Sequence, residues 1–157
     1  MIVVGSRFYA SDEHGNGRQA RARAALLRMR DVIAVNLQYV DETLRPDGFL
    51  TLPLLTQDSC TVTGAPGTRM PIVSEMLERL ADVAAGRGCR AFMFVNADIQ
   101  VTQQAVDWVA AGRYDAFAFS RADIDPATGA CAGMMITGID AVAFDLDWWR
   151  RDRKSVV

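Results

Sequence analysis

The chain has 157 residues, of which 50% are hydrophobic and 23% charged, and its formal net charge is −2. This length provides one domain with a hydrophobic core, and the near-neutral charge gives no electrostatic reason to expect nucleic acid as a partner. No apolar run approaches the roughly 18 residues of a membrane-spanning helix. The N-terminus lacks a signal peptide, and the three cysteines are odd in number and widely spaced, so we expect a cytoplasmic protein without disulfides.

Short apolar runs alternate with longer helical patterns along the chain. Runs rich in β-branched and aromatic residues predict strands, in chain order, at residues 2–4, 32–35, 59–63, 91–95, 114–120 and 141–144. The second of these strands ends at Asn36, or runs on to residues 39–40 if Asn36 lies inside it. Alanine-rich or amphipathic patterns predict helices at residues 19–29, 71–86 and 103–111. Residues 49–55 are apolar without a clear period, and residues 134–137 fit either a strand or a helix start. This alternation predicts an α/β fold with three layers, α/β/α, around a mostly parallel sheet.

The spacing and capping of two helices can be stated in more detail. Thr102 is the predicted N-cap of the last helix, and Gly112 its end. Residues 11–17 are predicted to be a polar loop before the first helix. By their spacing, one face of that helix carries Ala20, Ala24 and Leu27. Its arginines, such as Arg21, could meet phosphates, but a solvated surface is the preferred interpretation.

The strand predicted at residues 91–95 ends in a polar pair. Its apolar run is typical of a parallel strand buried on both faces, and Asn96-Ala97-Asp98 follows directly. Open α/β sheets bind ligands at the carboxyl ends of their strands. A carboxylate and an amide one residue apart suit a hard cation or the hydroxyls of a nucleotide. By themselves, these residues fit a simple turn before the helix equally well.

Other kinds of site are disfavoured. His14 is the single histidine and falls in a predicted loop, so a multi-histidine metal site is excluded and a Ser-His-Asp triad would depend on it alone. No Gly-x-Gly-x-x-Gly follows the first strand, and no Gly-Lys-Ser or Gly-Lys-Thr occurs. The remaining candidates are carboxylates at predicted strand ends, namely Asp98, Asp123 or Asp125, and Asp140.

Residues 92–99, Phe-Met-Phe-Val-Asn-Ala-Asp-Ile, resemble the strand and Asp-x-Asp motif of GT-A-type glycosyltransferases, which use nucleotide-diphospho-sugars. They resemble in particular a glycosyltransferase-like group with an Asn-x-Asp-Ile motif. Three further segments are placed as in that family: residues 64–69, 120–124 and 138–140. The resemblance implies a GT-A fold and a protein that transfers a sugar from a nucleotide-diphospho-sugar donor to an unknown acceptor.

The resemblance also implies a metal and its ligand. Asp98 would bind a divalent metal, Mn²⁺ or Mg²⁺, that bridges the donor's two phosphates and stabilises the charge of the leaving diphosphate. Asn96 would hold ribose or sugar hydroxyls, or a metal-bound water. Arg69, close to a helix N-terminus, would favour the pyrophosphate by its charge.

The other implied site residues surround this corner. Ser6 and Arg7, after the first strand, would border the nucleobase and ribose. Asp123 would complete the nucleotide-sugar site. Asp140 would bind the acceptor hydroxyl or act as general base, a group that an inverting transferase needs. For Arg7 and Arg69 a role as plain surface charge is the competing interpretation.

Two other functions stay open. A sugar-nucleotide-binding domain without turnover is one, because many GT-A enzymes have a further metal ligand, often histidine, beyond the motif, and no histidine follows Asp98. A sugar nucleotidyltransferase is less favoured, because Gly5-Ser6-Arg7 is too sparse for the glycine-rich basic loop that such enzymes have after the first strand.

The C-terminal segment, residues 152–157, follows two tryptophans and two arginines with no structural logic, and it resembles a translated sequencing adapter. We therefore expect it to be a non-native or disordered tail. In that interpretation residues 1–151 are the N-terminal part of a GT-A-like nucleotide-sugar-binding domain that is incomplete at its C-terminus.

Overall fold

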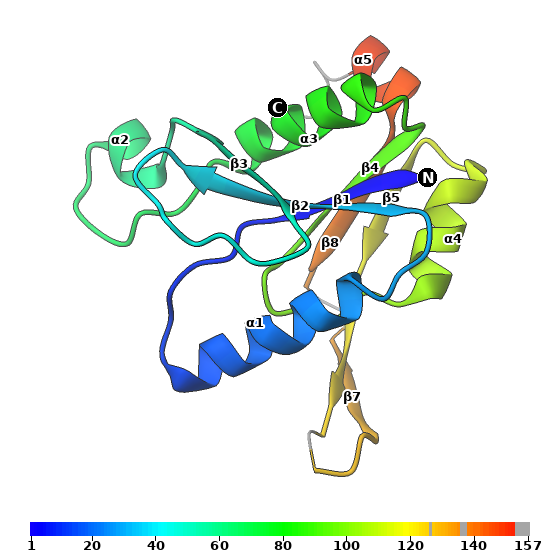
Figure 1. Cartoon of the computed structure of the whole chain (residues 1–157), viewed down its shortest axis with the longest axis horizontal. Helices are drawn as coiled ribbons and strands as arrows, with labels where there is room; N and C mark the ends of the chain where they lie inside the picture. Colours follow the sequence, from blue (N-terminus) through cyan, green and yellow to red (C-terminus); the bar gives the residue numbers. More distant parts are fainter. Residues whose placement is uncertain (126, 136–137, 153–157) are drawn as a thin grey trace.

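The computed structural model describes residues 1–125, 127–135 and 138–152. Its elements in chain order are β1 (Ile2–Ser6), α1 (Glu13–Leu26), β2 (Val32–Tyr39), β3 (Leu50–Leu55), α2 (Ser59–Thr63), α3 (Val73–Gly86), β4 (Ala91–Val95), α4 (Gln103–Ala111), β5 (Ala116–Phe119), β6 (Arg121–Ile124), β7 (Cys131–Met135), β8 (Ala141–Asp145) and α5 (Leu146–Asp152). Figure 1 shows a central sheet with helices around it and the β6–β7 hairpin extending away from the body of the molecule.

The main sheet has six strands in the order β3-β2-β1-β4-β8-β5. Strands β3, β2, β1 and β4 run parallel, with Val4 beside Ala34 on one side and Met93 on the other. β8 is antiparallel to both of its neighbours. The predicted α/β fold with a mostly parallel sheet is therefore confirmed. The strand order reverses between β1 and β4, and at such a reversal open α/β sheets bind ligands outside the carboxyl ends of the strands.

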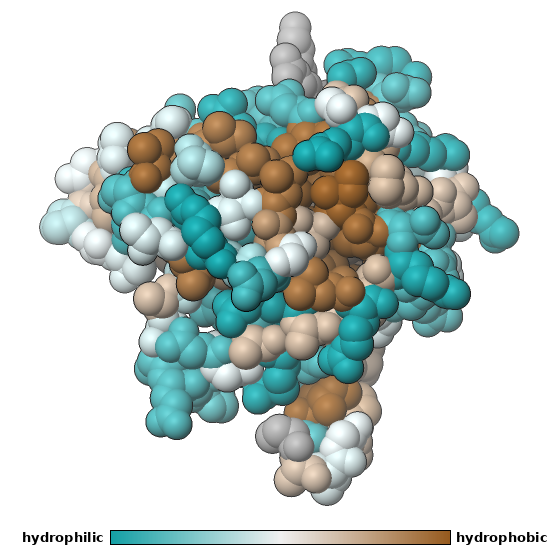
Figure 2. All heavy atoms as spheres, viewed as in Figure 1, coloured by the Kyte–Doolittle hydropathy of each residue, from teal (hydrophilic) through white to brown (hydrophobic). Residues whose placement is uncertain are grey.

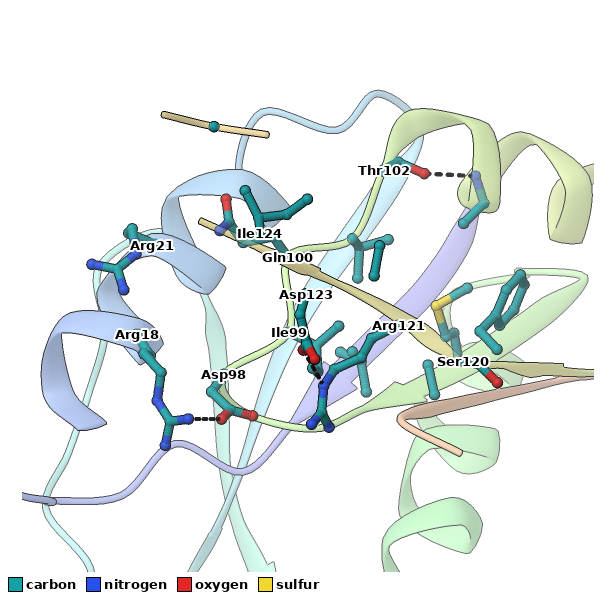
Figure 3. Close-up of a pocket in the computed structure, with 18 of the residues that line it drawn as sticks. Arg18, Arg21, Asp98, Ile99, Gln100, Thr102, Ser120, Arg121, Asp123 and Ile124 are labelled. Atoms are coloured by element: carbon teal, nitrogen blue, oxygen red, sulfur yellow. Dashed lines mark hydrogen bonds and ion pairs between the residues drawn. The ribbon is translucent and has the colours of Figure 1, made fainter. Parts of the chain in front are cut away.

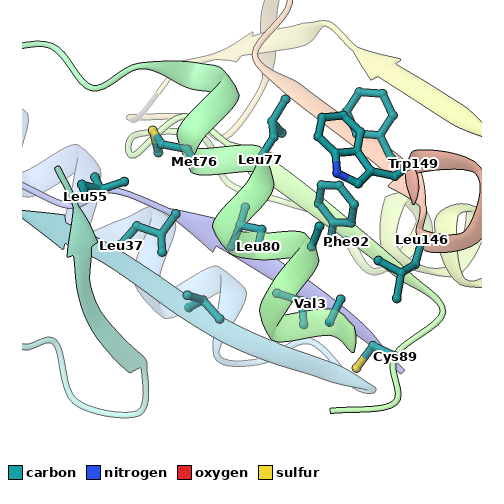
Figure 4. Packing of buried hydrophobic residues seen from close by; sticks show 14 of the residues in the cluster. Val3, Leu37, Leu55, Met76, Leu77, Leu80, Cys89, Phe92, Leu146 and Trp149 are labelled. Carbon is teal, nitrogen blue, oxygen red and sulfur yellow. The ribbon is translucent and has the colours of Figure 1, made fainter. Parts of the chain in front are cut away.

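Helices cover both faces of the sheet, because successive side chains of a strand point to opposite sides. On β1, Val3 belongs to the core that α3 and α5 complete, whereas Ile2 and Val4 belong to the core on the side of α1 and α4. Figure 4 shows the first of these cores, with Leu77 and Leu80 of α3 facing the sheet. The expected three layers are present.

Gly5 sets the distance between β1 and α3. A Cβ atom at this position would lie 2.1 Å from Cδ2 of Leu80, a side chain that is fully buried. Glycine therefore lets α3 pack closely against the strand that ends at the ligand-binding edge of the sheet.

Capping residues determine both ends of α4. The Thr102 side chain accepts a hydrogen bond from the Ala105 N–H, and Gly112 ends the helix with a φ of 60°. Both predictions are confirmed. Within residues 49–55, which lack a clear period, β3 (Leu50–Leu55) forms at the edge of the sheet, where Leu55 is buried and Leu54 is exposed. An edge strand of this kind does not need to alternate cleanly.

The strand predicted at residues 59–63 is wrong, because this segment forms the short helix α2. Asp58 is its N-cap and accepts a hydrogen bond from the Thr61 N–H at 2.8 Å. Gly64 ends the helix in the left-handed conformation, with a φ of 68°. Over five residues these two caps outweigh the β-propensity of the threonines and the valine between them.

The first helix begins earlier than predicted, at Glu13, so the predicted loop at residues 11–17 is wrong from Glu13 onward. Asp12 caps the helix by accepting from the Gly15 N–H at 2.7 Å. Gly15 and Gly17 obscured this start, since glycine is a poor helix former. His14 consequently lies in the first helical turn, although the sequence predicts it in a loop.

The predicted apolar face of α1 is also wrong. Ala20, Ala24 and Leu27 are exposed. The buried side of the helix consists of Gly15, Gln19, Ala22, Ala25 and Leu26. Gln19 can occupy this side because its amide group is hydrogen-bonded to the backbone N–H and C=O of Tyr9, at 3.1 and 3.0 Å. A satisfied polar side chain in the core cannot be recognised from hydrophobic spacing.

Trp149 anchors α5, the last helix of the described chain. Its ring lies 5.4 Å from that of Phe92 and 4.9 Å from that of Phe144. α5 includes Asp152, and the rest of the expected tail, residues 153–157, lies outside the described residues. β7 accounts for residues 134–135 as a strand, and residues 136–137 also lie outside.

None of the helices in the described ranges combines the length and the apolar character needed to cross a membrane. Figure 2 shows apolar side chains gathered near the centre of one face of the molecule, with hydrophilic side chains around them.

Candidate functional site

A cavity of about 870 Å³ lies beside the carboxyl end of β4. Its walls come from α1, from the loop between β4 and α4, and from the β6–β7 hairpin. Asp98 and Asp123 both line it, and Figure 3 shows Asp98 between the arginines of α1 and Arg121 of β6. The cavity thus adjoins the edge of the sheet at which α/β proteins bind ligands.

Asp98 is held by one ion pair. Its Oδ2 lies 3.3 Å from Nη1 of Arg18, and the two side chains are 35% and 50% exposed. An ion pair with this exposure contributes about 0–1 kcal/mol and exchanges readily. The Asp98 carboxylate is therefore open to a ligand that enters the cavity.

Asn96 and Asp140 are joined directly beside this cavity. The Asn96 backbone N–H donates to the Asp140 carbonyl at 3.0 Å, and Nδ2 of Asn96 donates to Oδ1 of Asp140 at 3.2 Å. They meet because β8 runs antiparallel to β4, which places the residue before β8 next to the residue after β4. The cavity is lined by two residues next to this pair: Arg121, which contacts Asp140, and Ala141, which follows Asp140 in the chain.

Arg121 connects the hairpin to this pair. Nη1 of Arg121 donates to Oδ1 of Asp140 at 3.0 Å, and Nε donates to Oδ1 of Asp123 at 3.0 Å. The hydrogen bond to Asp123, followed by the one to Asp140, raises the pKa of Arg121 above its usual value. Arg121 therefore bridges the two carboxylates, and its single positive charge offsets one of their two negative charges.

Asp140 keeps one oxygen that this arrangement does not use. The residue is 7% exposed, and its buried Oδ2 has no hydrogen-bond partner among the described residues. Buried carboxylate oxygens are nearly always paired. This oxygen is thus a buried acceptor that the arrangement leaves unsatisfied, and in the described structure Asp140 does not itself line the cavity.

A second group of polar residues lies at the carboxyl ends of β1 and β2, around the buried ring of Tyr39. Cζ of Arg69 lies 3.7 Å from the ring centroid, and Cζ of Arg7 lies 4.9 Å from it. Arg7 forms an ion pair with Glu42. The Tyr39 ring therefore stabilises two guanidinium groups by cation–π contact.

Acidic partners hold Arg69 in this group. Nε donates to Oδ2 of Asp58 at 2.8 Å, and Nη1 donates to both carboxylate oxygens of Asp41, at 3.0 and 2.8 Å. These hydrogen bonds raise the pKa of Arg69 and lower the pKa of Asp41. Burial raises the pKa of Tyr39 above its usual value, against the effect of the neighbouring arginines.

The structure therefore divides the predicted site residues into two groups. Asn96, Asp98, Asp123 and Asp140 lie at the cavity or directly beside it. The other group is Ser6, Arg7 and Arg69, and within the described chain none of these three lines the cavity. Ser6 is fully buried in register with Asn36, so it faces the interior.

A divalent metal would find one open carboxylate here. Within residues 1–125, 127–135 and 138–152, no three His, Cys, Asp or Glu side chains converge as a metal site. Mg²⁺ is commonly bound by one or two carboxylates together with substrate phosphates and waters. Asp98 can supply such a carboxylate, whereas Asp123 is occupied by Arg121. The residues present fit a metal that arrives with a phosphate-bearing ligand.

Sequence reasoning did not assign roles to three residues that shape the site: Arg18, Arg121 and Tyr39. The signal for Arg18 is its spacing from His14 and Arg21, which places all three on one helical face once the helix is known to start at Glu13. Arg121 and Tyr39 carry no local signal, because their roles depend on contacts with Asp140 and Arg69 that only the fold creates.

Comparison with known proteins leaves the site to be interpreted from its own geometry. No family model matches the chain, and no curated protein is significantly similar to it.

Proposed function

We propose that the protein is a glycosyltransferase-like protein of the GT-A type, which transfers a sugar from a nucleotide-diphospho-sugar donor to an acceptor with the assistance of a divalent metal. The observation that carries the proposal is the position of Asn96-Ala97-Asp98. This motif follows β4 at the reversal of the strand order and opens onto a cavity of about 870 Å³. Cavities of this size are typical of small-molecule sites.

The chain's own residues have distinct roles in this proposal. Asp98, which among the described residues pairs with the exposed Arg18, would hold the metal, and a metal there would supply stabilisation of the negative charge on the leaving diphosphate. Asn96 is oriented by Asp140 and presents its amide oxygen to ribose or sugar hydroxyls. Oδ2 of Asp140 is the proposed acceptor of a proton or a hydrogen bond from the acceptor hydroxyl, and it must first become exposed, because it is buried and Asp140 does not line the cavity.

The group around Tyr39 lies outside the lining of the cavity, so its proposed role in binding the nucleotide half of the donor rests on the family resemblance. Arg69 can turn one side of its guanidinium toward a phosphate, because Asp41, one of its two partners, is 69% exposed. Arg7 is more enclosed, with 12% of its side chain exposed, and holds Tyr39 and Glu42 in place. Ser6, which is buried, supports the strand end rather than contacting the ligand directly.

Calorimetric titration of UDP- and GDP-sugars, with and without Mn²⁺, tests the proposal. We expect binding that requires the metal in the unaltered protein and that is lost in Asp98→Ala. Asp82→Ala is the matched control, since Asp82 is an exposed carboxylate on α3 that does not line the cavity. Metal-dependent binding that survives Asp98→Ala would remove Asp98 from the site.

A sugar-nucleotide-binding domain without turnover is the second candidate, and the engagement of Asp140 favours it. Oδ1 of Asp140 is bound by both Asn96 and Arg121, so the carboxylate is already in use as a structural acceptor. Measuring the release of free nucleotide diphosphate from a bound donor separates the two functions. Saturable donor binding with no hydrolysis and no transfer favours the binding domain.

A further inference from the structure

One face of α1 lines the cavity with basic side chains. His14, Arg18 and Arg21 are spaced four and three residues apart, so they lie on one side of the helix, and all three line the cavity. The buried side of α1, which includes Gly15 and Gln19, is the neighbouring stripe. Figure 3 shows Arg18 reaching toward Asp98, with Arg21 one turn further along the helix.

The described lining has three arginines and three carboxylates, but they do not pair one to one. On the opposite wall Arg121 compensates Asp123, and the Asp125 carboxylate accepts from the Ala127 N–H at 2.8 Å and from the Thr128 hydroxyl at 2.9 Å within its own turn. Asp98 is the one carboxylate of the lining that pairs with α1, and it pairs with Arg18.

Arg21 is the unpaired arginine of the described lining. In the described residues neither Arg21 nor His14 has an ion pair or a hydrogen bond through its side chain. The Arg21 guanidinium folds back over Gly17, where an added Cβ would lie 3.8 Å from Nη1. The helix as a whole carries three arginines against one glutamate. An arginine at the rim of a cavity without a carboxylate partner is suited to an incoming anion.

We propose that His14, Arg18 and Arg21 form a binding site for a phosphate group of the ligand that enters the cavity. The planar guanidinium of arginine matches phosphate oxygens with two parallel hydrogen bonds, and these charge-assisted bonds are the stronger kind. The proposal that a phosphate group binds depends only on these three residues. The identity of the ligand that carries the phosphate rests on the proposed function. The phosphate belongs either to the donor diphosphate or to a phosphorylated acceptor.

Titration of inorganic phosphate in a phosphate-free buffer, without added metal, tests the site by chemical-shift changes. We expect saturable binding that Arg21→Gln weakens about tenfold, the loss expected for one charge-assisted hydrogen bond. Arg28→Gln is the matched control, because it removes the same charge from an exposed arginine just beyond α1 that does not line the cavity. Arg18→Gln is less suitable, since it also leaves Asp98 unpaired.

Three results would overturn the proposal: phosphate binding that does not saturate, Arg21→Gln that binds phosphate as tightly as the unaltered protein, or Arg28→Gln that weakens binding equally. UDP then distinguishes the source of the phosphate. If UDP displaces phosphate and Arg21→Gln weakens UDP binding, the wall binds the donor diphosphate. If phosphate and UDP bind together and Arg21→Gln leaves UDP affinity unchanged, the wall binds a phosphorylated acceptor. A protein that binds phosphate but no nucleotide would retain this site and lose the proposed function.

Discussion

Nδ2 of Asn96 donates to Oδ1 of Asp140 at 3.2 Å, across 44 residues of sequence. The backbone groups of the same two residues are also hydrogen-bonded, at 3.0 Å. An amide at position 96 can donate to a carboxylate, whereas a second carboxylate at that distance could not. The pairing therefore gives a physical reason for asparagine, rather than aspartate, at the first position of the motif.

Replacing Asn96 by aspartate should destabilise the protein at neutral pH. The introduced carboxylate would face the buried Asp140, and the like charge of Asp140 would raise the pKa of the introduced carboxyl group. A carboxyl group whose pKa is raised in the folded state costs stability above that pKa, and the cost is relieved as the pH falls through it. We expect a loss of about 1–3 kcal/mol at pH 7 that shrinks toward about pH 4, measured by urea denaturation.

Asn96→Ala is the control for that experiment. It removes the same hydrogen bond without adding a charge, so its loss of stability should change less with pH than that of Asn96→Asp. Equal stability of the Asn96→Asp variant and the unaltered protein at pH 7 would show that the two side chains do not interact in solution.

Asp98→Asn should leave the stability almost unchanged. The Arg18–Asp98 pair is exposed to solvent, and such pairs contribute about 0–1 kcal/mol. We expect a change within about 0.5 kcal/mol in thermal unfolding, together with the loss of metal-dependent ligand binding. A large loss of stability would mean that Asp98 serves the fold, which would argue against its role as a ligand.

Glu75 should make the stability of the protein depend on acidic pH. It is buried at the start of α3 and accepts hydrogen bonds from the Thr56 and Gln57 backbone N–H groups and from the Thr56 hydroxyl. Burial raises the pKa of Glu75, but these hydrogen bonds and Arg79 outweigh burial, so the pKa lies below its usual value. The ionised carboxylate therefore stabilises the fold above the ordinary glutamate pKa, about 4.3.

This contribution is lost as the pH falls through the lowered pKa of Glu75. Glu75→Gln should cost about 1–3 kcal/mol at pH 7 and progressively less in acid, measured by denaturation at several pH values. Glu78→Gln, which changes an exposed residue of the same helix, should have little effect at any pH. If both variants have the same pH profile, the hydrogen bonds to Glu75 do not contribute.

Gly5→Ala should destabilise the contact between β1 and α3. The added methyl group would lie 2.1 Å from Cδ2 of the buried Leu80, so this side chain must move within a packed core. Such overpacking costs about 1–3 kcal/mol. Gly86→Ala, at a helical glycine with nothing within 4 Å, should be neutral or stabilising. A neutral Gly5→Ala would indicate that α3 can shift without cost.

Elements with strong local signals could be predicted from the sequence, and elements decided by competing signals could not. α4 combines a capping threonine with a terminal glycine, so both ends were predictable. In α2 the same kinds of cap are present, at Asp58 and Gly64, but the β-rich residues between them favoured a strand. In α1 two glycines made the start of the helix unpredictable, and the buried Gln19 made its packed face unpredictable.

The candidate site was predictable only where chain direction determines position. Asn96 and Asp98 follow a buried parallel strand, and the carboxyl ends of such strands meet at one edge. The partners of charged residues depend on the folded chain: Arg69 contacts Asp41 and Asp58, and Arg121 contacts Asp140. No spacing rule relates these residues, because each contact joins segments that approach one another only after folding.

The hairpin formed by β6 and β7 is inserted between β5 and β8 where those strands adjoin the cavity. The Asp140 N–H donates to the Phe119 carbonyl at 3.0 Å, which closes the base of this insertion independently of its length. Residues 122–124 and 127–135 take no part in the pairing of the six-stranded sheet, whereas Arg121, at the start of the hairpin, also holds Asp140. Changes in the hairpin that keep Arg121 should therefore reshape one wall of the cavity while the pairing of the six-stranded sheet is preserved.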